Sequence, residues 1–201
     1  MGSSRTLIRL DVATKAFHTA ADAAWNDVFA DKLCEADYAA QLARVYGFEG
    51  PVEAAVAYTP GLRARIDLRG RMRAGLIAQD LLELDLHPAQ VARLPAIAIA
   101  PFSSVPEALG WMYVVERSTA FHHRVREHVL ALMPHLESAT SYLSAYETSV
   151  GTRWLELGEA IERIAYDGHG HAQVVVAACE ALRCSIDWMR RGRSAPVRRV
   201  G

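Results

Sequence analysis

Apolar residues recur at intervals of three and four along almost the whole chain, and the alternation typical of strands is scarce. This spacing places an apolar stripe along each predicted helix. The sequence therefore predicts an all-α fold of about eight helices, packed irregularly in a single domain rather than as a simple four-helix bundle. We expect these helices over residues 7–29, 36–46, 52–58, 63–84, 107–133, 135–146, 153–166 and 172–189.

Gly and Pro predict the helix boundaries. The second predicted helix stops at Gly47, shortly before another glycine and a proline. Residues 88–106 contain four prolines and are expected to form a loop-rich crossing. Ser104 is the expected N-cap of the helix that follows, since a proline and Glu107 occupy its predicted first turn.

Length and composition favour one soluble globular domain. A chain of 201 residues is long enough to bury a substantial core. We expect residues 1–190 to form the domain. Residues 191–201 are expected to be a disordered basic tail, because arginines there are mixed with Gly and Pro.

Charge and hydropathy exclude several classes of partner. The formal net charge is −1, and no local basic cluster stands out in the predicted fold, so no nucleic-acid partner is expected. No apolar run is long enough to cross a membrane, and the N-terminus lacks the apolar core of a signal peptide. Three cysteines without Cys-x-x-Cys spacing favour neither a disulfide framework nor a zinc site. We therefore expect a cytoplasmic protein.

His18 is the first candidate for chemistry. It lies on the same predicted helical stripe as Ala21 and Trp25, where a histidine is more often a hydrogen-bonded core residue than a ligand. An axial heme ligand needs the same setting, namely a neutral imidazole facing an apolar slot. Lys15, one turn earlier, is placed to reach a propionate or simply to face solvent.

The second candidate is the pair His122-His123, with His128 further along the same predicted helix. Consecutive helical residues point about 100° apart, so only one of the pair can face a given pocket. Glu116 and Thr119 share a face with His123, which leaves a non-heme metal site as a weak alternative. No second Glu-x-x-His unit accompanies it, as a di-iron bundle would require.

Two further features have ordinary structural explanations. His169-Gly170-His171 lies between two predicted helices and is interpreted as a turn rather than a metal site. Arg117, within an apolar helix, needs either a carboxylate partner or a route to solvent.

Residues 6–190 resemble the heme oxygenase family, most closely the bacterial branch found beside bacteriophytochromes. No single motif decides this, but the matches follow the family's order along the chain. They are Ala13-Thr14-Lys15-Ala16-Phe17-His18 with Asp22, Tyr38 to Phe48 with Pro51 and Glu53, Gln79-Asp80-Leu81, Tyr113-Val114-x-Glu116-x-Ser118, Tyr142 with Gly151 and Trp154, and Ala177-Ala178 with Trp188.

The resemblance implies a heme-oxygenase-like fold in which His18 is the proximal iron ligand. Heme would lie between the first helix and the distal helix, in contact with Lys15 and Tyr113, and Ser118 would hold distal water. With an electron donor, such proteins convert heme to biliverdin, carbon monoxide and iron, the cofactor supplying the difficult chemistry.

The distal helix departs from the family pattern at three positions. Where the family has glycines, this chain has Arg117, Phe121 and His122. Those glycines let the helix backbone approach the macrocycle and bend. Side chains there would displace the helix, fill the slot or supply a sixth ligand. A straighter, more rigid helix without the glycines is what a non-catalytic role would permit.

Three hypotheses follow. The leading one is a heme-oxygenase-like protein without ordinary heme-degrading turnover that acts as a regulatory or partner-binding protein, responsive to heme if heme still binds. The alternative is an active heme oxygenase that uses heme and an electron donor. The third is a protein that binds no heme, because Phe121 and His122 fill the slot.

Overall fold

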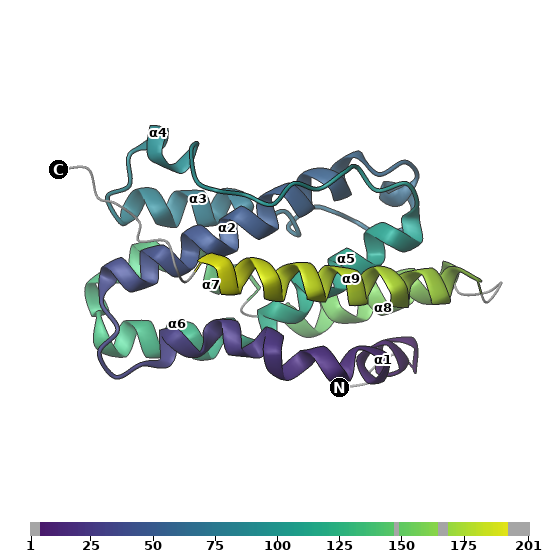
Figure 1. Cartoon of the computed structure of the whole chain (residues 1–201), viewed down its shortest axis with the longest axis horizontal. Helices are drawn as coiled ribbons and strands as arrows, with labels where there is room; N and C mark the ends of the chain where they lie inside the picture. Colours follow the sequence, from purple (N-terminus) through teal and green to yellow (C-terminus); the bar gives the residue numbers. More distant parts are fainter. Residues whose placement is uncertain (1–4, 147–148, 165–168, 193–201) are drawn as a thin grey trace.

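The computed structural model describes residues 5–146, 149–164 and 169–192, and contains no strand within them. The predicted all-α single domain is confirmed, with α9 running along the middle of the elongated molecule (Figure 1). The α-helices are α1 (Arg5–Asp22), α2 (Glu35–Tyr58), α3 (Ala74–Glu83), α4 (Pro88–Val91), α5 (Val105–Ser118), α6 (His122–Leu132), α7 (Ser141–Ser144), α8 (Val150–Ile164) and α9 (His169–Gly192). The 3-10 segments are η1 (Ala23–Phe29), η2 (Leu62–Ala64), η3 (Thr119–Phe121) and η4 (Pro134–Thr140).

Two hydrophobic clusters form the core. The first lies mainly among α1, α2, α5, α8 and α9, and the second among η1, α2, α3, α6, η4 and α7. Helix α2 contributes to both clusters, and Trp188 of α9 packs against both. The long α2 and α9 therefore connect the two halves of the domain.

Gly110 allows α5 and α9 to pack closely. A Cβ atom at this position would lie 2.6 Å from the Cβ of Ala177 and 2.6 Å from the carbonyl oxygen of Val174. Only a residue without a side chain fits between the two helices here. This contact fixes the position of α5, which carries the predicted site residues Tyr113, Arg117 and Ser118.

Helix α2 does not stop at Gly47 as predicted, but continues through Pro51 to Tyr58. Proline lacks an N–H group, so it cannot donate to the carbonyl of Gly47 four residues earlier. The Ile97 N–H donates to that carbonyl instead, over 2.9 Å. A hydrogen bond from a distant segment therefore satisfies the carbonyl and lets the helix continue.

The helix predicted over residues 63–84 is only half correct. Its second part forms α3, but residues 65–73 form an irregular segment in which Gly70 has a positive φ of 67°. Glu53 of α2 accepts hydrogen bonds from the backbone N–H groups of Arg73 and Ala74, over 2.6 Å and 3.0 Å. This carboxylate satisfies donors at the start of α3, which begins at Ala74, eleven residues later than we expected.

The expectation of one continuous helix over residues 107–133 is wrong. Residues 107–133 form α5, the 3-10 segment η3 and α6. Ser118 and Thr119, just before and within η3, each donate a side-chain hydrogen bond of 2.7 Å to the carbonyl three residues earlier. Hydroxyl groups bonded back to the helix backbone bend it even where no glycine is present.

The remaining helix boundaries differ less from the predicted ones. The first helix changes to 3-10 geometry after Asp22, and residues 134–146 form short turns of η4 and α7 rather than one helix. His169 to His171 form the first turn of α9, not a loop. Ser104 caps α5 as predicted, its hydroxyl accepting the Glu107 N–H over 3.4 Å. The predicted tail lies outside the described residues, apart from 191 and 192, which end α9.

Among the described residues, no helix combines the length and the apolar character needed to cross a membrane.

We predict that Gly110→Ala lowers the free energy of unfolding by about 1–3 kcal/mol, because the added methyl group forces α5 away from α9. Gly75→Ala is the matched control, since nothing lies within 4 Å of a Cβ atom there. This control should be neutral or stabilising by up to about 1 kcal/mol. Urea denaturation of both variants measures the difference, and equal stabilities would contradict a tight α5–α9 contact.

Candidate functional site

Thr14 is the centre of a hydrogen-bond cluster between α1 and α5. Its hydroxyl donates to the carbonyl of Leu10 over 2.9 Å, and lies 3.0 Å from Nε2 of His18 and 3.2 Å from the hydroxyl of Tyr113. The single proton of the Tyr113 hydroxyl has two acceptors within reach, Thr14 and the carboxylate of Asp11, the second at 3.3 Å. Because the Thr14 proton is directed to Leu10, Nε2 of His18 donates to Thr14 in this arrangement. That nitrogen is therefore engaged within α1.

His18 is largely buried, with 16% of its side chain exposed. Burial lowers the pKa of His18 below its ordinary value, and the positive charge of Arg117 lowers it further. The imidazole is accordingly neutral at pH 7. Lys15, one turn earlier, is exposed and forms no ion pair with any described residue. The structure thus places Lys15 on the solvated face of α1.

Arg117 connects the end of α1 to α5 by an ion pair with Asp22. Its two terminal nitrogens donate to the two carboxylate oxygens over 2.6 Å and 3.1 Å. This paired geometry matches the planar guanidinium to the carboxylate and is among the stronger polar contacts in proteins. Arg117 therefore has the carboxylate partner that an arginine in an apolar helix requires.

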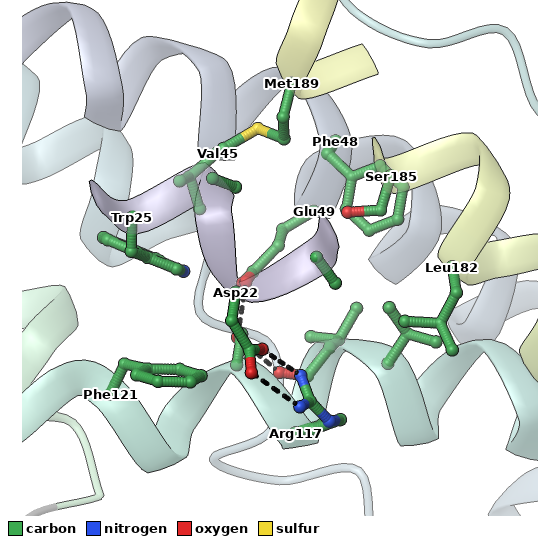
Figure 2. Close-up of a pocket in the computed structure, with 15 residues that line it drawn as sticks. Asp22, Trp25, Val45, Phe48, Glu49, Arg117, Phe121, Leu182, Ser185 and Met189 are labelled. Atoms are coloured by element: carbon green, nitrogen blue, oxygen red, sulfur yellow. Dashed lines mark hydrogen bonds and ion pairs between the residues drawn. The ribbon is translucent and has the colours of Figure 1, made fainter. Parts of the chain in front are cut away.

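A cavity of about 60 Å³ lies behind this ion pair, among η1, α2, α5 and α9 (Figure 2). Asp22, Glu49 and Arg117 gather at one end of it, and Ser118, which also lines the cavity, lies 3.4 Å from the Glu49 carboxylate. The rest of the lining is mainly apolar and comes from Ala21, Ala24, Trp25, Val45, Phe48, Val114, Val115, Phe121, Leu182 and Met189, with Ser185.

His122 does not face this cavity. Its ring lies 4.5 Å from the ring of Tyr142 and 6.1 Å from that of Trp25, measured between centroids. Burial lowers the pKa of His122 well below its ordinary value, and the charge of Arg73 contributes to the same effect, so the ring is neutral. Phe121, the preceding residue, does line the cavity. Of Phe121 and His122, the two bulky residues expected to fill the heme slot, only Phe121 lines this cavity.

The non-heme metal alternative has no support in the described part of the chain. His123 is exposed and lies 3.3 Å from Glu127, whereas Glu116 is buried and accepts hydrogen bonds from Arg71 and Tyr146, over 2.6 Å and 3.2 Å. His128 is half-buried, with its Nε2 3.4 Å from the Ala30 carbonyl. No group of three or more His, Cys, Asp or Glu suited to a metal ion occurs among the described residues.

A buried polar network lies at the polar end of the cavity. Glu49 accepts a 2.6 Å hydrogen bond from Tyr142, and Ser118 and Arg73 each lie 3.4 Å from its carboxylate oxygens. Arg73 also donates to the carbonyl of Val115 over 3.1 Å. Burial raises the pKa of Glu49, although Arg73 and Tyr142 oppose the shift. Ser118 faces this carboxyl group and also donates to the Val115 carbonyl.

Sequence reasoning did not identify Glu49, Arg73 and Tyr142 as site residues. Glu49 and Glu53 stand one turn apart in a segment that is otherwise apolar, and acidic residues in such a position need a partner. That signal was present in the sequence. The identity of the partner was not, because Arg73 and Tyr142 belong to other parts of the chain.

The described residues do not fit a porphyrin held as the family holds it. The cavity of about 60 Å³ is far below the ~300–1,000 Å³ of clefts that bury a drug-sized ligand. His18 does not line this cavity, and its Nε2 is bonded to Thr14. The contacts of Tyr113 and Arg117 with α1 occupy the space between the first and distal helices.

Comparison with protein-family models, curated proteins and solved structures finds no match to this chain. The resemblance to heme oxygenases therefore depends on the ordered sequence motifs alone.

We predict that stability falls as pH rises from about 4.5 to 7 because of Glu53. Burial raises the pKa of Glu53 to about 7, with a further contribution from the Glu49 carboxylate. The folded protein then retains a proton that the unfolded chain releases at lower pH, so deprotonation destabilises the fold by on the order of 2–3 kcal/mol.

Glu53→Gln removes this titration and keeps an oxygen that accepts from the backbone of Arg73 and Ala74. Its free energy of unfolding should change less between pH 4.5 and 7 than that of the wild type. Denaturant melts across this pH range measure the slopes. Parallel slopes would show that Glu53 does not titrate as we expect.

Proposed function

We propose that this chain is a heme-oxygenase-like protein that does not degrade heme in the ordinary way and acts instead as a regulatory protein by binding a protein partner. The observation that carries the proposal is the ion pair between Arg117 and Asp22. Arg117 stands where the family has a glycine, and its side chain connects the two helices between which heme would lie.

The contacts beside this ion pair support the same conclusion. Tyr113 of α5 lies 3.2 Å from Thr14, and Phe121 of η3 lines the neighbouring cavity, so side chains from α5 and η3 occupy space that a distal glycine helix leaves free. A heme-responsive form of this role requires the ion pair to open first. The enzyme alternative also requires the Arg117–Asp22 ion pair to open. No contact among the described residues favours the open arrangement over the closed one.

Exposed apolar residues on α1 support a partner-binding role. Ile8 and Val12 lie one turn apart on this helix, with 51% and 66% of their surface exposed. Leu7 and Leu10, on its other side, are buried. The cytoplasmic location and the absence of a nucleic-acid partner stay predictions from the sequence.

We expect a hemin titration of the purified protein to give no saturable shift of the Soret band. We also expect no biliverdin when hemin and a reductant such as ascorbate are supplied. Absorption spectra follow both. A tight complex that converts heme to biliverdin would overturn the proposal in favour of the enzyme.

The double variant Arg117→Gly, Phe121→Gly should raise the affinity for hemin by at least about tenfold, because it removes the side chains that occupy the slot. The matched control is His123→Gly, Arg124→Gly, which removes two exposed side chains from the neighbouring turn of α6. It introduces the same number of helix-weakening glycines and should leave hemin affinity unchanged.

Adding His18→Ala to the Arg117→Gly, Phe121→Gly variant tests whether His18 is the ligand of the heme iron. The Soret band of the opened protein should change when His18 is removed. An unchanged spectrum would exclude His18 as the ligand, and equal hemin affinities of the two double variants would count against side-chain closure of the slot.

A further inference from the structure

The segment of residues 62–73 separates its arginines into two groups. Arg71 and Arg73 are buried, together with the apolar side chains of Leu62, Ile66 and Leu68. The other three arginines of the segment, Arg63, Arg65 and Arg69, are exposed. The expectation that the fold contains no local basic cluster is therefore wrong at this surface.

Several contacts hold the backbone of this segment in place. Asp67 accepts the Arg69 N–H on its carboxylate over 2.9 Å and the Arg71 side chain on its backbone carbonyl over 3.0 Å. Arg163 of α8 donates to the carbonyl of Arg65 over 3.3 Å. The exposed arginines thus project from a backbone that needs little ordering when something binds.

The three exposed guanidinium groups have no ion-pair partner among the described residues, and the carboxylate of Asp67 is engaged by the backbone. The three arginines are among residues 63–69, which line an open hollow of about 490 Å³. A chain of net charge −1 therefore concentrates unpaired positive charge at one place. Such a concentration attracts anionic groups.

We propose that Arg63, Arg65 and Arg69 form a docking surface for a carboxylate-rich segment of a protein partner. This inference rests on the partner-binding function proposed above and names the chemistry of the partner.

All three basic residues are arginines, whose planar forks bind carboxylates and phosphates alike through paired hydrogen bonds. Two observations favour a carboxylate-rich protein segment over a nucleic acid. Three cations are fewer than the roughly 6–10 phosphate contacts of a typical DNA-binding protein. The hollow also has no aromatic side chain on which a base could stack.

A fluorescein-labelled octaglutamate peptide tests the surface on the full chain. Fluorescence anisotropy should show saturable binding that weakens as salt rises. The triple variant Arg63→Ala, Arg65→Ala, Arg69→Ala should lose about tenfold in affinity, as expected for three partly solvated ion pairs. Circular dichroism melts check that it folds like the wild type.

The matched control replaces three exposed arginines elsewhere, Arg9→Ala, Arg93→Ala, Arg190→Ala, and changes the net charge by the same amount. It should bind the peptide as the wild type does. An equal loss in both triple variants would show that net charge alone drives binding and would overturn the docking surface. Tighter binding of a single-stranded oligonucleotide of equal charge would overturn the assignment to a protein partner.

The hemin titration reports on the space between α1 and α5, which does not include residues 63–69. If the protein binds neither the peptide nor hemin and shows no turnover, the proposal of a docking surface is wrong. The proposal that side chains close the space between α1 and α5 is then retained. If the protein degrades heme, the regulatory function fails whatever the peptide result.

Discussion

The burial of two arginine side chains is the constraint on which much of this structure depends. Moving a guanidinium group out of water costs several kcal/mol unless carboxylates and carbonyls surround it. Arg71 bonds to Glu116 over 2.6 Å and to Glu156 over 2.7 Å. Arg73 lies 3.4 Å from Glu49 and bonds to the carbonyl of Val115. These partners come from α2, α5 and α8, so the two cations fix how the three helices lie relative to residues 65–73.

Helix α5 supplies partners to both buried arginines and to Asp22 of α1. Consecutive residues on a helix point about 100° apart, and three consecutive residues of α5 serve three different neighbours. The Val115 carbonyl accepts from Arg73, the Glu116 carboxylate from Arg71, and the Arg117 side chain reaches Asp22 at the end of α1. With Gly110 pressed against α9, the helix has little freedom to move. Closure of the space between α1 and α5 is therefore part of the same packing that forms the core.

The motifs on which the resemblance to heme oxygenases depends and the departures from them belong to different parts of this arrangement. His18 of α1 and Tyr113 of α5, two residues of those motifs, both lie within hydrogen-bond distance of the Thr14 hydroxyl. The residues at the three positions where heme oxygenases have glycines do not act alike. Arg117 forms an ion pair, Phe121 lines a cavity, and His122 is buried beside Tyr142 on another side. The proposed loss of heme turnover thus depends chiefly on Arg117 and Phe121.

The sequence by itself determined the helical class and the start of α5 at Ser104, since each depends on residues close together in the chain. For Arg117 it left open a carboxylate partner or a route to solvent, and only the tertiary structure supplied Asp22 as the partner. The continuation of α2 through Pro51 could not be predicted, because the donor that makes it possible is the Ile97 N–H. Periodicity also cannot distinguish a solvated arginine from a buried one, and only the tertiary structure separated Arg71 and Arg73 from Arg63, Arg65 and Arg69. A buried charge is decided by partners from other elements, and those meet only when the chain has folded.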